Sequence, residues 1–262
     1  MPLLPGAEPF GRDGGPTGVL FCHGFTGTPA TMTPWAEAIA AAGYTVAVPR
    51  LPGHGTTWQE LNTTRWPDWY AEIEHAFDAL RGRCEQVFVA GLSMGGTLAL
   101  RLAEQRGDQV AGLLLVNPSL LTLNRMATLL PVLSRIRASR GSLGGDIKKQ
   151  QTEEPSYGRT PLRALNSLRR FWAVVRPGLA RVTQPMLLFH SSVDHVVEPV
   201  NSQILLAEVG STDVTERRLD DSFHVATLDN DAPVIFAESV DWLDRHASAT
   251  GSPSESAASG RT

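Results

Sequence analysis

The sequence predicts one α/β domain with a mostly parallel central sheet and helices on both faces of that sheet. Short apolar runs bounded by Gly and Pro, typical of buried strands, alternate with longer segments that have helical apolar spacing and helix end signals. Strands separated by helices in this way pair in parallel, because each helix carries the chain back across a face of the sheet. The chain has 262 residues, 42% hydrophobic and 19% charged, which is enough for one such domain.

The alternation covers both ends of the chain. Residues 17–23 form a short apolar run between Gly and Pro signals and predict a buried strand, and the helix that follows has Pro34 in its first turn and stops at Gly43. The same signals predict the other elements. Strands are expected at 17–23, 44–48, 86–90, 111–116, 186–190 and 214–219, and helices at 31–42, 67–80, from the turn at 91–96 to 106, 201–209 and 233–246.

Residues 118–181 interrupt this alternation. They are helix-like with many Pro and Gly interruptions, and none of their apolar runs predicts a strand. We expect a small helical cap or lid at 118–181, inserted after the sixth strand between two parts of the α/β core at 1–117 and 182–247. The tail at 248–262 is mainly Ser, Ala and Gly without a large apolar residue, so it is expected to be disordered.

The composition excludes several classes of function. A formal net charge of −4 is not that of a general nucleic-acid binder, which is strongly basic. No apolar run approaches the roughly 20 residues of a membrane span, and no basic and apolar leader opens the chain, so a cytoplasmic location is expected. Cys22 and Cys84 lack metal-ligand spacing and are expected to be packing residues, and we expect neither a metal nor an organic cofactor.

The strongest chemical signal is Gly91-Leu-Ser93-Met94-Gly95-Gly96, which lies between a predicted strand and a predicted helix. A sharp turn at this place lifts the serine hydroxyl above the sheet, and small residues beside it avoid collisions with neighbouring backbone. The turn also sets the amide N–H of Met94 at a helix N-terminus, where it can donate to a developing oxyanion. We therefore predict that Ser93 is a nucleophile, against the simpler interpretation of a Gly-rich turn with a buried serine.

A serine nucleophile requires a base within hydrogen-bond reach, and the expected chain order places that base last. His224 follows the last predicted strand on a short polar loop, where it can reach over the carboxyl edge of the sheet. His190 ends a buried strand, and His246 lies late in the last helix. His224 is therefore the predicted base.

Asp194 holds the matching place after the preceding strand, and is predicted to orient the base, because functional groups of open α/β sheets gather at the carboxyl ends of the strands. Asp220 and Asp221 compete for this role, but they are so near His224 that the chain would have to fold back sharply. His195 is expected to be a wall or surface residue.

The segment from His23 to Gly27 follows the first predicted strand. It is expected to supply the second oxyanion donor, the backbone N–H of Phe25, and the loss of one such donor typically costs about 2.7 to 4 kcal/mol. His23 and His54 are expected to brace loops.

Four segments resemble the bacterial monoacylglycerol lipases and related small carboxylesterases of the α/β-hydrolase fold. The resemblance covers nearly the whole chain except the tail, and it is carried by residues 23–29, 91–97, 194–197 and 223–229. It implies that Ser93, Asp194 and His224 match the family's catalytic triad. It also implies that Phe25 and Met94 match the oxyanion donors, and that a small cap covers an apolar tunnel for one acyl chain, with polar groups that receive glycerol.

The chain departs from this family at one position. The lipases have an acidic residue that binds glycerol between a Tyr and a basic-Thr-Pro run, whereas this chain has Gly158 between Tyr157 and Arg159. Glu153 or Glu154 is the alternative acid for this role, although the position of neither is equivalent. The departure weakens the expectation of a monoacylglycerol substrate and leaves ester hydrolysis unchanged.

The predicted cap is apolar at its front and basic over most of its length. We expect Leu121 and Ile147 from the cap, and Val196 beside Asp194, to contact the acyl group. From Pro131 to Arg181 there are eleven Lys and Arg residues against three acids. This charge is either a solvated helical face, which is the simpler interpretation, or a surface that steers the protein to anionic lipid, at up to about 1 kcal/mol per basic residue.

These observations predict a serine hydrolase that cleaves carboxylic esters through an acyl-enzyme, with monoacylglycerols or similar medium-chain acyl esters as substrates. A carboxylesterase of broad or short-chain preference is the alternative among enzymes. A non-catalytic small-molecule binding protein on the same fold is the alternative outside them, since fold alone does not determine function. A small-molecule ester is the expected partner, and the sequence does not predict an oligomeric state.

Overall fold

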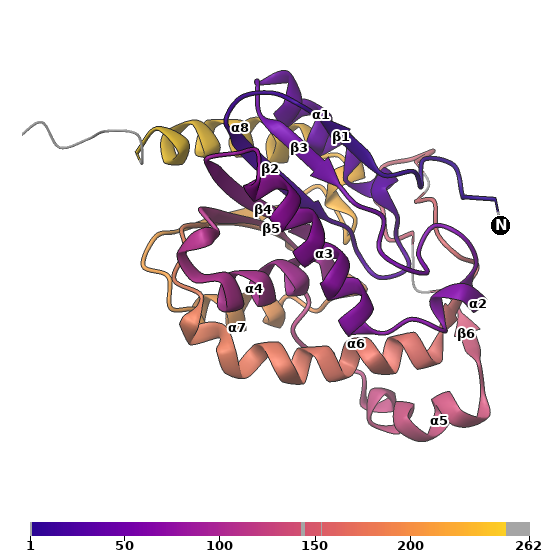
Figure 1. Cartoon of the computed structure of the whole chain (residues 1–262). Helices are drawn as coiled ribbons and strands as arrows, with labels where there is room; N and C mark the ends of the chain where they lie inside the picture. Colours follow the sequence, from indigo (N-terminus) through magenta and orange to yellow (C-terminus); the bar gives the residue numbers. More distant parts are fainter. Residues whose placement is uncertain (1, 143–144, 153, 250–262) are drawn as a thin grey trace, which may run out of the picture.

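The computed structural model describes residues 2–142, 145–152 and 154–249. Its main sheet has the strand order β1-β3-β2-β4-β5-β8-β9, with β1 antiparallel to β3 and the other neighbours parallel. The predicted α/β architecture is confirmed (Figure 1). The strands of this sheet are β1 (Phe10–Arg12), β2 (Thr17–Cys22), β3 (Thr45–Val48), β4 (Gln86–Leu92), β5 (Gly112–Val116), β8 (Met186–Ser191) and β9 (Val214–Leu219).

Helices cover both faces of the sheet. The α-helices are α1 (Thr33–Ala41), α2 (Trp58–Leu61), α3 (Trp66–Arg81), α4 (Met94–Arg106), α5 (Leu130–Ile136), α6 (Leu162–Val175), α7 (Val200–Glu208) and α8 (Ala232–Ala249). Short 3₁₀-helices are η1 (Pro29–Thr31), η2 (Gly107–Gln109), η3 (Arg125–Leu129), η4 (Arg176–Arg181) and η5 (Ala226–Leu228).

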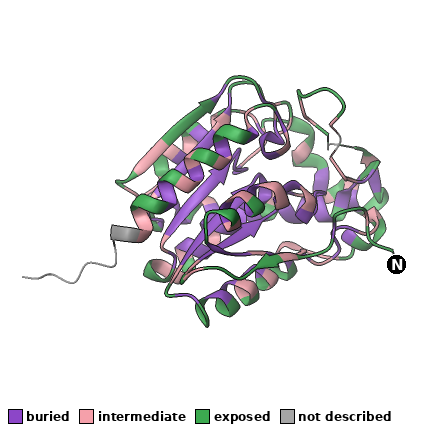
Figure 2. Ribbon diagram, turned by 90° about the horizontal axis from the view of Figure 1, so that it is seen from above, coloured by how far each residue is buried: buried purple, intermediate pink, exposed green. Residues whose placement is uncertain are grey.

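The side chains of β2 show how the sheet is buried. Val19 and Phe21 pack into an apolar cluster with Trp35 of α1 and Trp242 of α8, whereas Leu20 points into the cluster on the face covered by α3, α4 and α7. Buried residues accordingly concentrate on the central strands and on the helix sides that face them (Figure 2). Parallel strands buried on both faces read as continuous apolar runs, which is why the sequence predicts them well.

The segment that follows β5 differs from its prediction in two ways. It follows the fifth strand in chain order and not the sixth, because only β1 precedes β2 among the described residues. It also contains an antiparallel two-stranded ladder of β6 (Ser139–Gly141) and β7 (Arg159–Pro161). Three residues per strand are too few for a period-two pattern to stand out in the sequence.

Helix α6 fastens this inserted segment to the core. It contacts α3, α4 and α5, and Phe171 stacks on Trp66 at the start of α3 with ring centroids 4.8 Å apart. In Figure 1, α6 runs across one side of α3 and α4, and α5 lies on the outer side of α6. The inserted segment therefore has a packed part at α6 and an outer part at η3 and α5.

Helix α8 continues to Ala249, so the first two residues of the tail predicted to be disordered are helical. The rest of that tail, 250–262, lies outside the described residues. Among the helices of the part that the structure describes, none has the length and apolar character needed to cross a bilayer.

Candidate active site

Ser93 occupies a sharp turn between β4 and α4. Its φ of 58° and ψ of −118° are strained for a residue with a side chain, and α4 begins at the next residue, Met94. A Cβ on Gly91 would collide with the backbone of Gly95, and a Cβ on Gly95 would collide with the carbonyl oxygen of Cys22. The predicted collisions of a Cβ beside the serine are confirmed, and the two glycines allow the turn to lie against the end of β2.

The loop after β2 lies beside the serine. Cys22 of β2 pairs with Gly91 of β4, so Phe25 and Met94, each three residues further on, come to the same edge of the sheet. A Cβ on Gly24 would be 3.5 Å from the Cβ of Ser93, which shows how closely this loop approaches the turn. The predicted amide donors therefore belong to two backbone segments that flank Ser93.

His224 and Asp194 form a buried pair. The Nδ1 atom of His224 is 2.7 Å from Oδ2 of Asp194, and only 8% and 2% of the two side chains are exposed. The other carboxylate oxygen, Oδ1, accepts hydrogen bonds from the backbone N–H groups of Val196 and Val197 at 2.8 and 2.7 Å. The contact of its Nδ1 with Asp194 leaves Nε2 of His224 as the nitrogen that can serve a reacting group.

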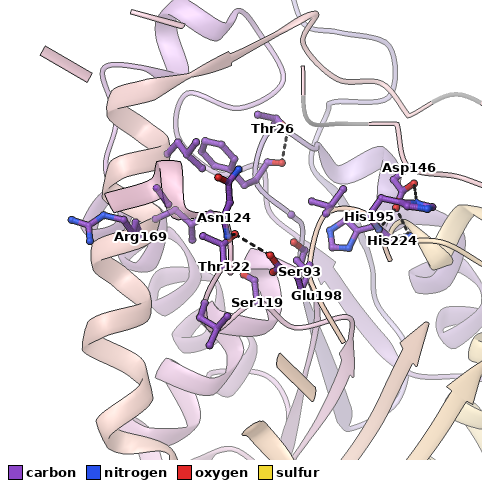
Figure 3. Close-up of a pocket in the computed structure, with 18 of the residues that line it drawn as sticks. Thr26, Ser93, Ser119, Thr122, Asn124, Asp146, Arg169, His195, Glu198 and His224 are labelled. Carbon is purple, nitrogen blue, oxygen red and sulfur yellow. Dashed lines mark hydrogen bonds and ion pairs between the residues drawn. The ribbon is translucent and has the colours of Figure 1, made fainter. Parts of the chain in front are cut away.

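Ser93 and His224 line one cavity of about 480 Å³ at the carboxyl ends of the strands. Figure 3 shows the His224 imidazole beside Ser93 at the wall of this cavity. Ser93 and His224 thus line the same cavity, and Asp194 contacts His224, although the three residues are far apart in the sequence.

The charge around His224 favours its protonated form. Burial by itself lowers the pKa of His224, but the charge and hydrogen bond of Asp194 raise it, and so do the charges of Glu154 and Asp146. The net effect is a pKa above the ordinary value for histidine. An imidazole stabilised in its protonated form suits a group that must hold a proton during a reaction.

Asn117 is a site residue that sequence reasoning missed. It follows β5 at a φ of 45°, and its Nδ2 donates to Oγ of Ser191 at 3.0 Å and to the carbonyl oxygen of His224 at 2.8 Å. Its Oδ1 accepts from the N–H of Ser191 at 2.8 Å. Asn117 thereby ties the end of β5 to the end of β8 and to the loop of His224. The signal for it in the sequence was an Asn directly after an apolar strand, since Asn tolerates positive φ.

The residues predicted to contact substrate separate into two groups. Leu121 and Val196 line the cavity, together with Met126, Leu130 and Trp172. Ile147 is not among the lining residues, and its partly buried side chain packs against the cluster of β2, α1 and α8 instead.

Two acids from the inserted segment, Asp146 and Glu154, line the cavity, and only Glu154 was considered for such a role from the sequence. The carboxyl group of Glu154 accepts from the N–H of Gly145 at 2.8 Å, and burial raises its pKa. Asp146 contacts the loops of His195 and His224. Gly158 is not among the lining residues, and Glu153 lies outside the described residues.

The buried histidines of the neighbouring loops are structural. Burial lowers the pKa of His23 to about 4, so the ring is neutral at pH 7, and its Nε2 accepts from the N–H of Leu51 at 3.2 Å. The ring of His54 packs edge-on against that of His23, with centroids 5.0 Å apart. Both hold the loop at 51–55 against β2, as expected.

The sheet, the strained turn and the cavity at its carboxyl edge define an α/β-hydrolase. A solved chain from work on "LipS and LipT, two metagenome-derived lipolytic enzymes" has a TM-score of 0.91 and 40% identity, covering 94% of this chain and 100% of that one. The Paleococcus ferrophilus monoacylglycerol lipase has the same fold, with a TM-score of 0.77 and 21% identity over 94% of this chain and 100% of that chain.

The chain belongs to the family described as "Serine aminopeptidase, S33", whose model matches residues 17–231, and it is a serine hydrolase. It is 43% identical to the thermostable monoacylglycerol lipase of Bacillus sp. (strain H-257), over 94% of this chain and 98% of that protein. It is 26% identical to a carboxylesterase of Bacillus subtilis (strain 168), over 90% of this chain and 98% of that protein. The predicted resemblance is therefore confirmed.

We expect the imidazole of His224 to titrate above 6.5, its ordinary value, when followed by NMR. Because the folded state binds this proton more tightly, the pair stabilises the fold at pH below 6.5, and the contribution is lost as pH rises through the folded pKa. Asp194→Asn should lower the pKa, whereas Asp220→Asn, in the same loop as His224, should leave it unchanged. A titration of His224 below 6.5 in the parent protein would show that burial outweighs the neighbouring acids, contrary to this expectation.

Proposed function

We propose that the protein hydrolyses carboxylic esters with Ser93 as nucleophile, His224 as general base and Asp194 as the group that orients the base. The observation that carries the proposal is the 2.7 Å contact of His224 with Asp194 beside a serine held at a strained turn on the same cavity. A serine hydroxyl is a weak nucleophile at neutral pH, and an adjacent imidazole of fixed tautomer is the usual way to activate it.

The reaction has two steps. His224 takes the proton of Ser93 as its oxygen attacks the ester carbonyl, and the N–H groups of Phe25 and Met94 hold the oxyanion. His224 then protonates the leaving alcohol, which departs and leaves an acyl-enzyme. Water, activated by the same imidazole, releases the carboxylic acid and restores Ser93.

The cavity supports a medium-chain acyl ester, such as a monoacylglycerol, as substrate. It is lined by apolar side chains, among them Leu121, Leu133, Leu165 and Val196, and each methylene buried there gains about 0.8 kcal/mol. The carboxyl group of Glu154 supplies a polar wall that suits the hydroxyl groups of glycerol. The relative from Bacillus sp. (strain H-257), a monoacylglycerol lipase by name, supports the same substrate class.

Replacement of Ser93 by Ala should abolish turnover and leave the fold intact, because the change removes one oxygen atom from the cavity wall. Hydrolysis of a p-nitrophenyl ester and labelling by a fluorophosphonate probe measure it, with Ser119→Ala, at the same cavity, as the matched control. Normal hydrolysis by the Ser93→Ala variant would refute the assignment. A parent protein that neither turns over esters nor takes the label would favour the binding-protein hypothesis.

A substrate panel separates the lipase from the carboxylesterase alternative, which the relative from Bacillus subtilis represents. For monoacylglycerols and p-nitrophenyl esters of increasing chain length, kcat/KM should rise severalfold from acetyl to medium-length acyl groups, as the apolar wall is filled. At a pH above the acid limb, Glu154→Gln should raise KM for monoacylglycerols more than KM for p-nitrophenyl esters, which have no glycerol hydroxyl groups. A preference for acetyl esters would identify a short-chain carboxylesterase.

We further propose that the protein contacts anionic lipid surfaces transiently through η3, α5 and the arginines beside them. Met126, Leu129, Val132 and Ile136 are 55%, 48%, 59% and 77% exposed, and their spacing places them along one side of this segment. Met126 also lines the cavity, so the apolar stripe leads to the site. An exposed apolar stripe with basic neighbours is typical of helices that lie in a membrane interface.

The basic neighbours surround a hollow of about 350 Å³ between α3, α5 and α6. It is lined by Arg65, Arg135, Arg163 and Arg170. In the described part of the chain none of these four forms an ion pair with a carboxylate. Arg65 and Arg163 donate to backbone carbonyl oxygens, so the charges of the four arginines are not neutralised by an acid and can attract phosphate groups of lipid.

Binding to vesicles with phosphatidylglycerol should weaken as salt is raised, because ions screen the attraction. The double variant Arg135→Gln and Arg170→Gln should lose up to about 2 kcal/mol of binding free energy. Co-sedimentation measures it, with phosphatidylcholine vesicles and the variant Arg83→Gln, at the opposite end of the sheet, as controls. A response that is flat with salt would remove the lipid-surface proposal.

A further inference from the structure

A short piece of the inserted segment, Gly145 to Lys149, lies across the loops that carry His224 and Asp194. The side chain of Asp146 makes the central contacts. Its Oδ2 accepts from the backbone N–H of His224 at 3.2 Å and from that of His195 at 3.0 Å. Its Oδ1 is 2.8 Å from Nδ1 of His195, and its own carbonyl oxygen accepts from the N–H of Val225 at 3.1 Å.

These contacts join two loops that follow different strands. Asp194 and His195 follow β8, and His224 follows β9, so one carboxylate from a third element holds the backbone of both. The side chain of Asp146 is only 15% exposed, and hydrogen bonds to an ionised acceptor are stronger than those between neutral groups. Asp146 therefore binds the backbone of the two loops whose side chains, His224 and Asp194, make the 2.7 Å contact.

Asp229 makes the reciprocal contacts from the loop of His224. Its carboxylate accepts from the N–H of Lys148 at 2.7 Å, from that of Lys149 at 2.8 Å and from that of Phe223 at 2.9 Å. Ile147, between the two anchoring points, is partly buried and packs against the core. Contacts at both ends and in the middle thus fix the position of the piece from Gly145 to Lys149. They also fix the position of the Asp146 carboxylate relative to the loop of His224.

Asp146 also acts on the imidazole through its charge. The charged groups that face His224 are Asp194 from the β8 loop, and Glu154 and Asp146 from the inserted segment. All three raise the pKa of His224 against the effect of burial. Asp146 differs from the other two because it also binds the backbone of the residue that it influences.

We propose that Asp146 is a positioning residue for ester hydrolysis, which holds the loops of His224 and Asp194 in register from the inserted segment. The proposal rests on the proposed role of His224 as the base. Asp146 does not contact the reacting atoms, and it acts through His224.

The test is the pH dependence of kcat and KM for a p-nitrophenyl ester with Asp146→Asn, which removes the charge and one acceptor. We expect kcat to fall about tenfold or more, with KM changed by less than about threefold, because the loss of a hydrogen bond to a charged group amounts to at least one factor of ten. The acid limb of the pH profile of kcat should move to lower pH. His224 must be neutral to act as the base, and its pKa falls when the negative charge of Asp146 is lost. Asp220→Asn, an exposed acid in the loop of His224, is the control and should change neither.

An Asp146→Asn variant that melts like the parent and keeps its kcat and acid limb would overturn the proposal. If that variant does not stay folded at the assay temperature, Asp146→Glu replaces it: a reduced kcat with the acid limb in place supports the proposal, and an unchanged kcat overturns it. Ser93→Ala in the same assay distinguishes a failure of the proposed function from a failure of the proposed role of Asp146. Hydrolysis that survives Ser93→Ala refutes the proposed function itself, whereas an inactive Ser93→Ala beside an unaffected Asp146→Asn refutes only the role of Asp146.

Discussion

The site depends on how closely the first turn of α4 approaches the end of β2. Gly95 lies directly over the carbonyl oxygen of Cys22, with no room for a side chain between them. Because β2 and β4 are neighbours in the sheet, this contact also brings the loop of Phe25 beside Ser93. The hydrogen bonds of a sheet set the spacing of neighbouring strands at about 4.8 Å. The distance from the Ser93 hydroxyl to the proposed donors, the N–H groups of Phe25 and Met94, is constrained by this spacing. The geometry proposed for catalysis is therefore first a consequence of backbone packing.

A second constraint is that three acidic side chains lie around the imidazole of His224. Asp194, Glu154 and Asp146 all accept hydrogen bonds from backbone N–H groups, which offsets the cost of burying carboxylates. Their charges, together with the hydrogen bond from Asp194, raise the pKa of His224 more than burial lowers it. The inserted segment supplies two of the three acids, so it contributes to the electrostatics of the site as well as to the walls of its cavity.

The inserted segment divides into parts with different surroundings. Helix α6 is fastened to α3 and α4, and the piece from Gly145 to Lys149 is fastened to the loops at the carboxyl edge of the sheet. Outside these anchored parts, η3 and α5 expose apolar side chains such as Val132 and Ile136. A surface contact at α5 and a supporting role at Asp146 are thus compatible, because they use different parts of the segment.

The sequence by itself was sufficient for the alternating sheet and the turn at Ser93, and it led to the prediction of His224 and Asp194, two residues that contact each other in the structure. Each of these leaves a local trace: an apolar run between breakers, glycines beside a serine, or a polar loop after a strand. Only the tertiary structure decided the contacts of Asn117 and Asp146, the β6 and β7 ladder, and the packing of Ile147 against the core and not at the cavity. Asp146 and His224 are 78 residues apart, and Asn117 and His224 are 107 apart. No periodicity of the chain records such pairs, because their partners are set by the way β5, β8, β9 and the inserted segment meet at one edge of the sheet.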